Sequence, residues 1–167
     1  MARVSIITAC YNAEKYIGRT IESVWAQTFT DWEHVVVDDG STDNSTAVVE
    51  TYVPREPRLR LLRQPNGGPS NAHNNGFAAS SAESDYLLFL NADDCLEPEM
   101  LAVMASYLDA RPEVGLAYCG CLYIDSDDHV LGKKEMIRYA PGNSGVFEVG
   151  ELPAHCRRPF ITYETTP

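Results

Sequence analysis

The sequence predicts an α/β fold: a mostly parallel central sheet with helices on both faces. Short apolar runs alternate with segments of helical periodicity through the first 120 residues, a pattern typical of strands joined by helical crossovers. Polar residues follow three of these runs, at 9–12, 38–40 and 90–94. Right-handed crossovers bring such strand ends to one edge of a sheet, where open α/β sheets bind ligands.

Five strands and four helices account for this pattern. The expected strands are residues 3–9, 32–38, 58–63, 85–90 and 114–119. Asn12 can cap the first helix, which buries Ile17 and Ile21 at helical spacing. The second helix should stop before Pro54, and Pro98 suits the first turn of the fourth.

Three hydroxyl and carboxyl side chains, those of Ser41, Thr42 and Asp43, offer caps to the second helix. The third helix should follow the loop at 64–69 and carry Ala72 and Phe77. Beyond residue 120 the pattern changes, and residues 125–128 read as a turn.

Charge and composition exclude several classes of protein. The net charge of -11 over 167 residues disfavours binding to nucleic-acid phosphates or to anionic lipid through a basic face. The first residues lack the pattern of a signal peptide, and no apolar run is long enough to span a bilayer. These observations predict a cytoplasmic protein with no transmembrane segment.

The five cysteines form neither an even framework nor a CxxC pair, so reduced thiols are expected. Cys119 and Cys121 share one face if they lie in a strand. A metal role for this pair is disfavoured.

The carboxylates at the strand ends indicate a metal site. Asp93 and Asp94 follow one apolar run, and Asp38 and Asp39 follow another. Taken singly, each cluster is explained equally well as a turn whose side chains cap the next helix. Together they favour one shared cleft.

Four motifs in order resemble the family 2 glycosyltransferases of the GT-A fold. They are VSIITACYN at 4–12, VDDGSTD at 37–43, GGPS at 67–70 and FLNADD at 89–94. The resemblance implies a Rossmann-like three-layer α/β/α sandwich. It covers about residues 3–120, which correspond to the nucleotide-sugar-binding half of that family.

The resemblance implies transfer of a sugar, with inversion, from a nucleotide-diphosphate donor, a UDP-sugar, to the hydroxyl of a saccharide or lipid-linked acceptor in cell-envelope synthesis. A lipid-linked acceptor would bring the protein to the inner membrane surface. Asp93 and Asp94 would bind Mg²⁺ or Mn²⁺, which neutralises the leaving diphosphate. Asp39 would accept the imide N–H of the base, and Tyr11 would stack on it. The full set implied for the nucleotide-sugar is Thr8, Ala9, Tyr11, Asn12, Asp39, Gly68, His73, Asn91 and Ala92.

Two residues depart from the family pattern. Asn91 stands where Asp is commoner, so it adds no negative charge to the metal site, and His73 stands where relatives commonly carry Arg. A protonated His73 would replace part of that lost cation, although a lone helical histidine is more often structural. These departures leave open a second reading, a non-catalytic nucleotide-sugar-binding module.

The chain reads as one domain, with residues 1–120 forming the nucleotide-sugar half and 121–167 beginning an acceptor-side segment that we expect to be truncated. The catalytic base is unassigned and expected beyond the chain end. Glu148, Glu151 and Glu164 read as solvated glutamates. A nucleotidyltransferase is disfavoured because residues 8–15 lack a Gly-rich basic loop, and a dinucleotide dehydrogenase because no GxGxxG follows the first strand.

Overall fold

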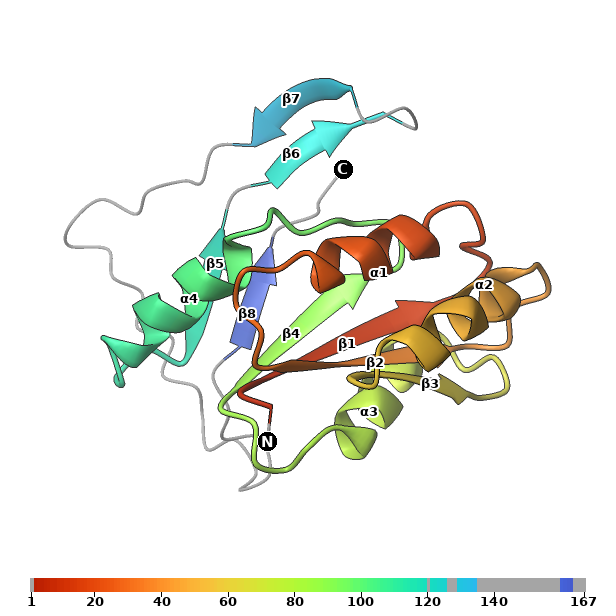
Figure 1. Ribbon diagram of the computed structural model, residues 1–167, viewed down its shortest axis with the longest axis horizontal. Coiled ribbons are helices and arrows are strands. Elements are labelled where there is room, and N and C mark those ends of the chain that lie inside the picture. The colour runs from red at the N-terminus through yellow and green to blue at the C-terminus, as the bar shows by residue number, and fades with distance from the viewer. Residues whose placement is uncertain (1, 120, 126–128, 135–159, 164–167) are drawn as a thin grey trace.

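The computed structural model describes residues 2–119, 121–125, 129–134 and 160–163. A six-stranded sheet forms its centre (Figure 1), and every pairing within the sheet is parallel. The strands lie in the order β3 (Leu59–Arg63), β2 (Trp32–Asp38), β1 (Val4–Cys10), β4 (Tyr86–Asn91), β8 (Phe160–Tyr163) and β5 (Leu116–Cys119).

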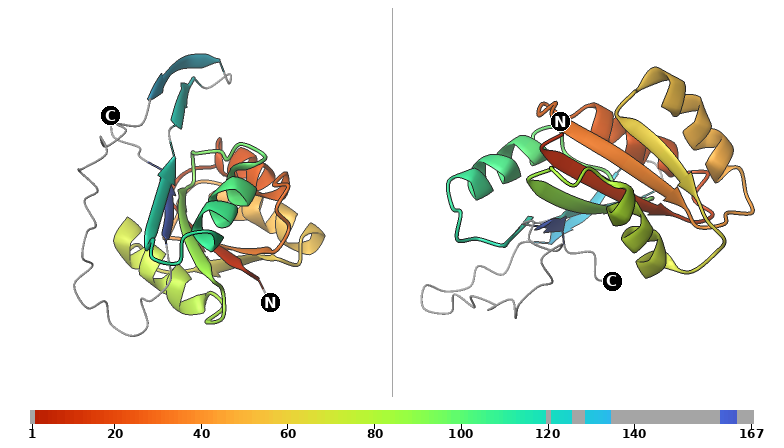
Figure 2. Two further views of the ribbon diagram at one scale, coloured as in Figure 1. Left: turned by 90° about the vertical axis from the view of Figure 1, so that its left-hand side faces the viewer. Right: turned by 90° about the horizontal axis from the view of Figure 1, so that it is seen from below.

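Helices cover both faces of this sheet, which confirms the predicted three-layer α/β/α architecture (Figure 2). One face carries α1 (Ile17–Trp25), α2 (Ser45–Tyr52) and α4 (Met100–Asp109), whose apolar side chains join the buried side chains of β1, β2 and β4. The other face carries α3 (Pro69–Ala79), which packs on β1 and β2.

The approach of α3 to the sheet depends on one glycine. A Cβ built at Gly76 would lie 2.4 Å from Cγ2 of Ile7 and 3.0 Å from Cγ2 of Val37, closer than packed carbons tolerate. Because Gly76 has only a hydrogen there, α3 settles against β1 and β2.

The structure corrects two of the expected helix starts. Helix α1 begins at Ile17, without a side-chain cap. Asn12 does not cap it, because Asn12 takes a left-handed conformation (φ 49°) and its side-chain oxygen accepts from the backbone N–H of Thr42 at 2.8 Å. Pro98 precedes the first residue of α4, Met100, and its carbonyl accepts from the Thr28 backbone N–H at 2.9 Å.

The end of α2 is confirmed at Tyr52, where a single 3₁₀ turn (Val53–Arg55) begins and includes Pro54. Of the three expected caps, Asp43 accepts from the backbone N–H of Ser45, the first residue of the helix, at 2.9 Å. Ser41 and Thr42 instead bond to the loop after β1.

Beyond β5 the chain forms elements that the pattern does not predict. Strands β6 (Cys121–Ile124) and β7 (Val130–Lys134) pair as an antiparallel hairpin beside the main sheet, on either side of the predicted turn (Figure 1). Strand β8 inserts between β4 and β5. The expected boundary at residue 120 therefore falls between β5 and β6, and a strand from the later segment joins the sheet of the earlier one.

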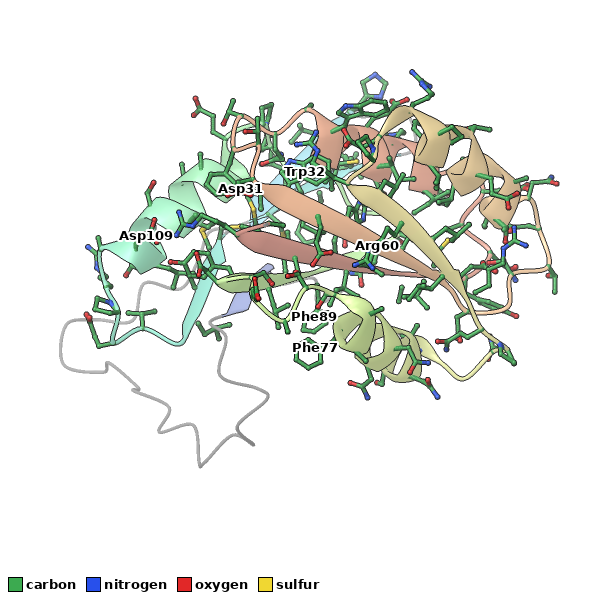
Figure 3. The ribbon with its side chains drawn as sticks, turned by 60° about the horizontal axis from the view of Figure 1, so that its bottom comes forward. Asp31, Trp32, Arg60, Phe77, Phe89 and Asp109 are labelled. Carbon is green, nitrogen blue, oxygen red and sulfur yellow. The ribbon has the colours of Figure 1, made fainter. Side chains whose placement is uncertain are left out.

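The amino ends of β1 and β4 are held by an ion-pair cluster around Arg3, to which Asp109, labelled in Figure 3, belongs. The Arg3 guanidinium donates to Asp85, just before β4, at 2.7 Å and to Asp109, at the end of α4, at 2.6 Å. The Tyr86 hydroxyl also donates to Asp109. Arg3 holds the pKa of Asp109 below its usual range, whereas burial and the bond to Asp109 raise the pKa of Tyr86 to about 12.

Candidate nucleotide-sugar site at the carboxyl edge of the sheet

The strand ends named by the sequence meet at one edge. In the sheet register Ala9 pairs with both Val37 and Asn91, and Cys10 pairs with Asp38. The loops after β1, β2 and β4 therefore begin side by side, which confirms the predicted juxtaposition.

The loops after β1 and β2 are joined by hydrogen bonds from the DGSTD motif. Asn12 donates its backbone N–H to Ser41 Oγ at 3.0 Å and accepts from Thr42 N–H. Asp43 accepts from the backbone N–H of Glu14 at 3.1 Å. Much of this motif therefore serves to fix the first loop, and Tyr11 remains 51% exposed at its tip, where a base can stack on the ring.

Asp39 connects the edge to the glycine loop. Its carboxylate accepts from Gln64 Nε2 at 2.6 Å, from Gly67 N–H at 2.8 Å and from Gly68 N–H at 2.8 Å. Gly68 has a φ of 85°, which a side chain would disfavour, and Pro69 follows it as the first residue of α3. A carboxylate has about four lone-pair positions, so these three bonds leave one of them unused, although the Asp39 residue is only 3% exposed.

The loop after β4 presents the acidic pair. Asp93 is exposed, and Asp94 accepts from the Asn91 side-chain amide at 2.8 Å, so Asn91 orients the second carboxylate. The carbonyl of buried Ala92 accepts from Thr20 Oγ1 of α1 at 2.8 Å, which anchors the loop.

The donor set at this loop fits a hard divalent cation that is shared with a substrate. Within the described ranges, no three His, Cys, Asp or Glu side chains are close enough to form a metal cage. Two adjacent carboxylates without such a cage suit Mg²⁺ or Mn²⁺, which commonly fill their remaining positions with phosphate oxygens and water.

One of the two expected contacts at the end of β1 faces the interior. Thr8 is fully buried, and its hydroxyl lies 2.8 Å from Nε2 of His34, inside the sheet. Ala9 is partly exposed and packs on the α3 side. The Thr8 side chain is therefore not at the edge.

His73 belongs to α3, and its ring centroid lies 5.0 Å from that of Phe89 in β4, which is labelled in Figure 3. Its Nε2 is buried and has no hydrogen-bond partner in the described part of the chain. Burial lowers the pKa of His73, so the ring is neutral at pH 7. The environment therefore opposes the positive charge that the family resemblance implied for this position.

A cavity beside the acidic loop was not foreseen. It has a volume of about 560 Å³ and lies between Asp93 and Asp94, helix α4 and the β6–β7 hairpin. Cys95, Cys119 and Cys121 all line it, but their spacing along the chain does not predict a cavity. None of the three forms a disulfide with another described residue, nor does Cys10, while Cys156 lies outside the described residues.

The parallel α/β sheet thus presents Asp39 and an acidic loop at its carboxyl edge, which is where open α/β sheets bind their ligands. The model of glycosyl transferase family 2 matches residues 5–157. The chain belongs to this family.

The sequence relatives include bacterial polysaccharide synthases. An uncharacterized glycosyltransferase of Nostoc sp. is 38% identical over 117 residues, which are 70% of this chain and 36% of the relative. The chondroitin synthase of Pasteurella multocida is 41% identical over 96 residues, 58% of this chain and 10% of the synthase. The chain thus spans about a third or less of these relatives.

Solved structures of the same fold carry nucleotide-sugars. S. aureus TarS 1–349 in complex with UDP-GlcNAc is 33% identical, with a TM-score of 0.64, over 71% of this chain and 34% of TarS. The mannosyltransferase PcManGT of Pyrobaculum calidifontis, in complex with GDP-Man and Mn²⁺, is 26% identical, with a TM-score of 0.64, over 70% of this chain and 35% of that one. No helix in the described ranges is long and apolar enough to cross a bilayer.

Proposed function

We propose that this chain carries the donor site of an inverting glycosyltransferase that moves a sugar from a UDP-sugar to an acceptor hydroxyl, with Mg²⁺ or Mn²⁺. The proposal rests on one observation: Asp39 and the Asp93–Asp94 pair lie at the same edge of the sheet. They follow β2 and β4, and both of these strands pair with β1. The complexes of similar proteins with UDP-GlcNAc and with GDP-Man and Mn²⁺ support it.

Each part of the edge has a role in this proposal. Asp39 accepts the imide N–H of uracil with its remaining lone pair while its other bonds hold Gly67 and Gly68, and Tyr11 covers the base. Asn91 and Ala92 lie toward the ribose. Asp93 and Asp94 hold the divalent cation, which neutralises charge on the departing diphosphate.

Transfer of the sugar requires a base that takes the proton of the acceptor hydroxyl. Among the described residues, no motif supplies such a base. The three glutamates near the end of the sequence lie outside the described residues; they are Glu148, Glu151 and Glu164. The acceptor is a saccharide chain or a lipid-linked sugar, by analogy with the synthases among the relatives.

The burial of neutral His73 favours a second candidate, a nucleotide-sugar-binding module without turnover. Loss of a fixed cation weakens stabilisation of the diphosphate as it leaves, but affects ground-state binding of the base less. Release of UDP from UDP-sugars, measured with acceptor mixtures, separates the two. Metal-dependent binding without any release of UDP would favour the module.

The test of the donor site is calorimetric titration of UDP with Mn²⁺, repeated with a chelator. We expect binding only with the metal. The base contact is tested by comparing UDP with CDP, whose base lacks the imide N–H. Wild type should prefer UDP, and Asp39→Asn should reduce the preference.

CDP serves as the internal control, because loosening of the glycine loop by Asp39→Asn weakens both nucleotides. An unchanged ratio of UDP to CDP affinity would remove Asp39 from base recognition. UDP binding that persists in chelator would remove the metal.

A further inference from the structure

The cavity beside Asp93 and Asp94 has the size of a small-molecule site. Its volume of about 560 Å³ lies within the usual range for pockets that enclose ligands. Asp93 and Asp94 line it, together with residues of the β6–β7 hairpin. A ligand that fills it therefore lies beside the proposed metal site.

The walls of the cavity are mainly apolar. Val103 of α4 and Val130 of β7 both line it and are each 60% exposed, while Ile124 of β6 is 39% exposed. Met100 and Met104 supply thioether side chains, which adapt to irregular ligands. Aliphatic side chains this exposed around one cavity provide contact area for a hydrocarbon group.

The charged residues that line the cavity, among those described, are all acidic. They are Asp93, Asp94, Glu97 and Glu99. Asp93 and Asp94 belong to the proposed metal site, so the two glutamates decide the charge of the cavity away from that site. An anionic group placed beside Glu97 and Glu99 is repelled, whereas an uncharged hydrocarbon group is not.

We propose that this cavity holds an uncharged apolar group of the acceptor and thereby places the acceptor hydroxyl beside the donor. This inference rests on the proposed function and specifies its acceptor as a sugar that carries an alkyl or aryl group next to the reacting unit. The acceptor's own anionic groups, where it has them, lie outside the cavity.

The test uses the two methionines as reporters. Of the four methionines in the chain, Met100 and Met104 line the cavity, so ¹³C-methyl methionine labelling reports directly on its occupancy. The probes are octyl β-D-glucoside and octyl sulfate, which share one alkyl chain, each below its micellar concentration. We expect saturable shifts of the Met100 and Met104 signals with the glucoside and weaker binding of the sulfate.

Two neighbouring residues of β7 give a matched pair of variants. Val130 lines the cavity, whereas Leu131, 70% exposed, does not. Val130→Glu should weaken octyl glucoside by about tenfold or more, because it puts a carboxylate against the alkyl chain. Leu131→Glu should leave the affinity unchanged. Both side chains are exposed, so neither variant threatens the core.

Four results would overturn the proposal: no saturable shift, tighter binding of the sulfate, equal effects of the two glutamates, or self-association that covers the cavity with a second copy. UDP titration of the same samples separates this inference from the proposed function. UDP binding without glucoside binding rejects the cavity assignment alone. Glucoside binding without UDP binding rejects the donor site instead.

Discussion

The two ends of strand β4 each carry exposed aspartates, and the fold uses them differently. Asp85, before the strand, pairs with Arg3 at 2.7 Å in a cluster that joins the first strand to the end of α4. Asp93 and Asp94, after the strand, appear in none of the ion pairs between described residues. A carboxylate with a built-in cation stabilises the fold, and a carboxylate without one is available to a cation from solution.

The largest expected effect tests this contrast directly. Asp93→Asn should weaken Mn²⁺-dependent UDP binding by at least about a hundredfold, or about 2.7 kcal/mol, because one of two ligand carboxylates is lost. Asp85→Asn, the matched change at the other end of β4, should leave UDP affinity unchanged. Calorimetry on both variants measures this, and equal losses would end the distinction between the two ends.

Next in size is the loss of the glycine-loop anchor. Asp39→Asn places an amide N–H₂ where the carboxylate accepts three bonds, so we expect about 2 kcal/mol less stability and faster hydrogen exchange at Gly67 and Gly68. The control is Asp38→Asn, since Asp38 accepts from Ser41 N–H at a longer 3.4 Å. Unaltered exchange at both glycines in Asp39→Asn would show that the anchor does not hold the loop.

A buried histidine in the interior of the sheet, His34, predicts that the stability of the fold depends on pH. Burial lowers the pKa of His34 from 6.5 to about 3. As the pH falls through 6.5 the unfolded chain takes up a proton that the folded chain refuses, so stability is complete above pH 6.5 and is lost between 6.5 and 3. The slope approaches about 1.4 kcal/mol per pH unit.

Urea denaturation between pH 7 and 5 measures this slope before most carboxylates titrate. His73, whose pKa burial also lowers, adds to it. His34→Gln and His73→Gln should therefore each reduce the slope. A flat stability profile in wild type over this range would show that His34 becomes charged in the folded state.

The smallest expected effect is at the amino end of the sheet. Arg3→Met should cost about 1 kcal/mol, because the ion pairs are partly exposed and water screens them. Thermal denaturation at low and high salt measures it, and the difference from wild type should shrink in salt. UDP affinity should not change, and a loss there would couple the two ends.

Local patterns in the sequence were enough to predict the first four strands and the edge of the sheet that they form. Each strand is a short apolar run, and the acidic residues follow the runs directly, so position along the chain also gave position in space. The role of Asn12 could not be read this way. Its side chain can cap a helix, but the fold uses it to hold Thr42, about thirty residues away.

Contacts between distant segments explain the other differences. Thr8 belongs to a motif, but its partner His34 fixes it inside the sheet. The lowered pKa of His73 depends on its partial burial against Phe89 of β4, which its own neighbours in sequence do not reveal. The cavity needs α4 and the hairpin together, and no single segment shows it.

Strand β8 has a consequence for the order in which the molecule is assembled. In the described sheet, β5 pairs with β8 and not with β4, so residues 116–119 have no strand partner until residues 160–163 exist. During synthesis from the amino end, the four strands β1 to β4 and the helix α3 can fold first as one unit. Some forty more residues must then be synthesised before β5 can join the sheet. Until then the edge of β5 is unpaired and can bind a strand of another chain.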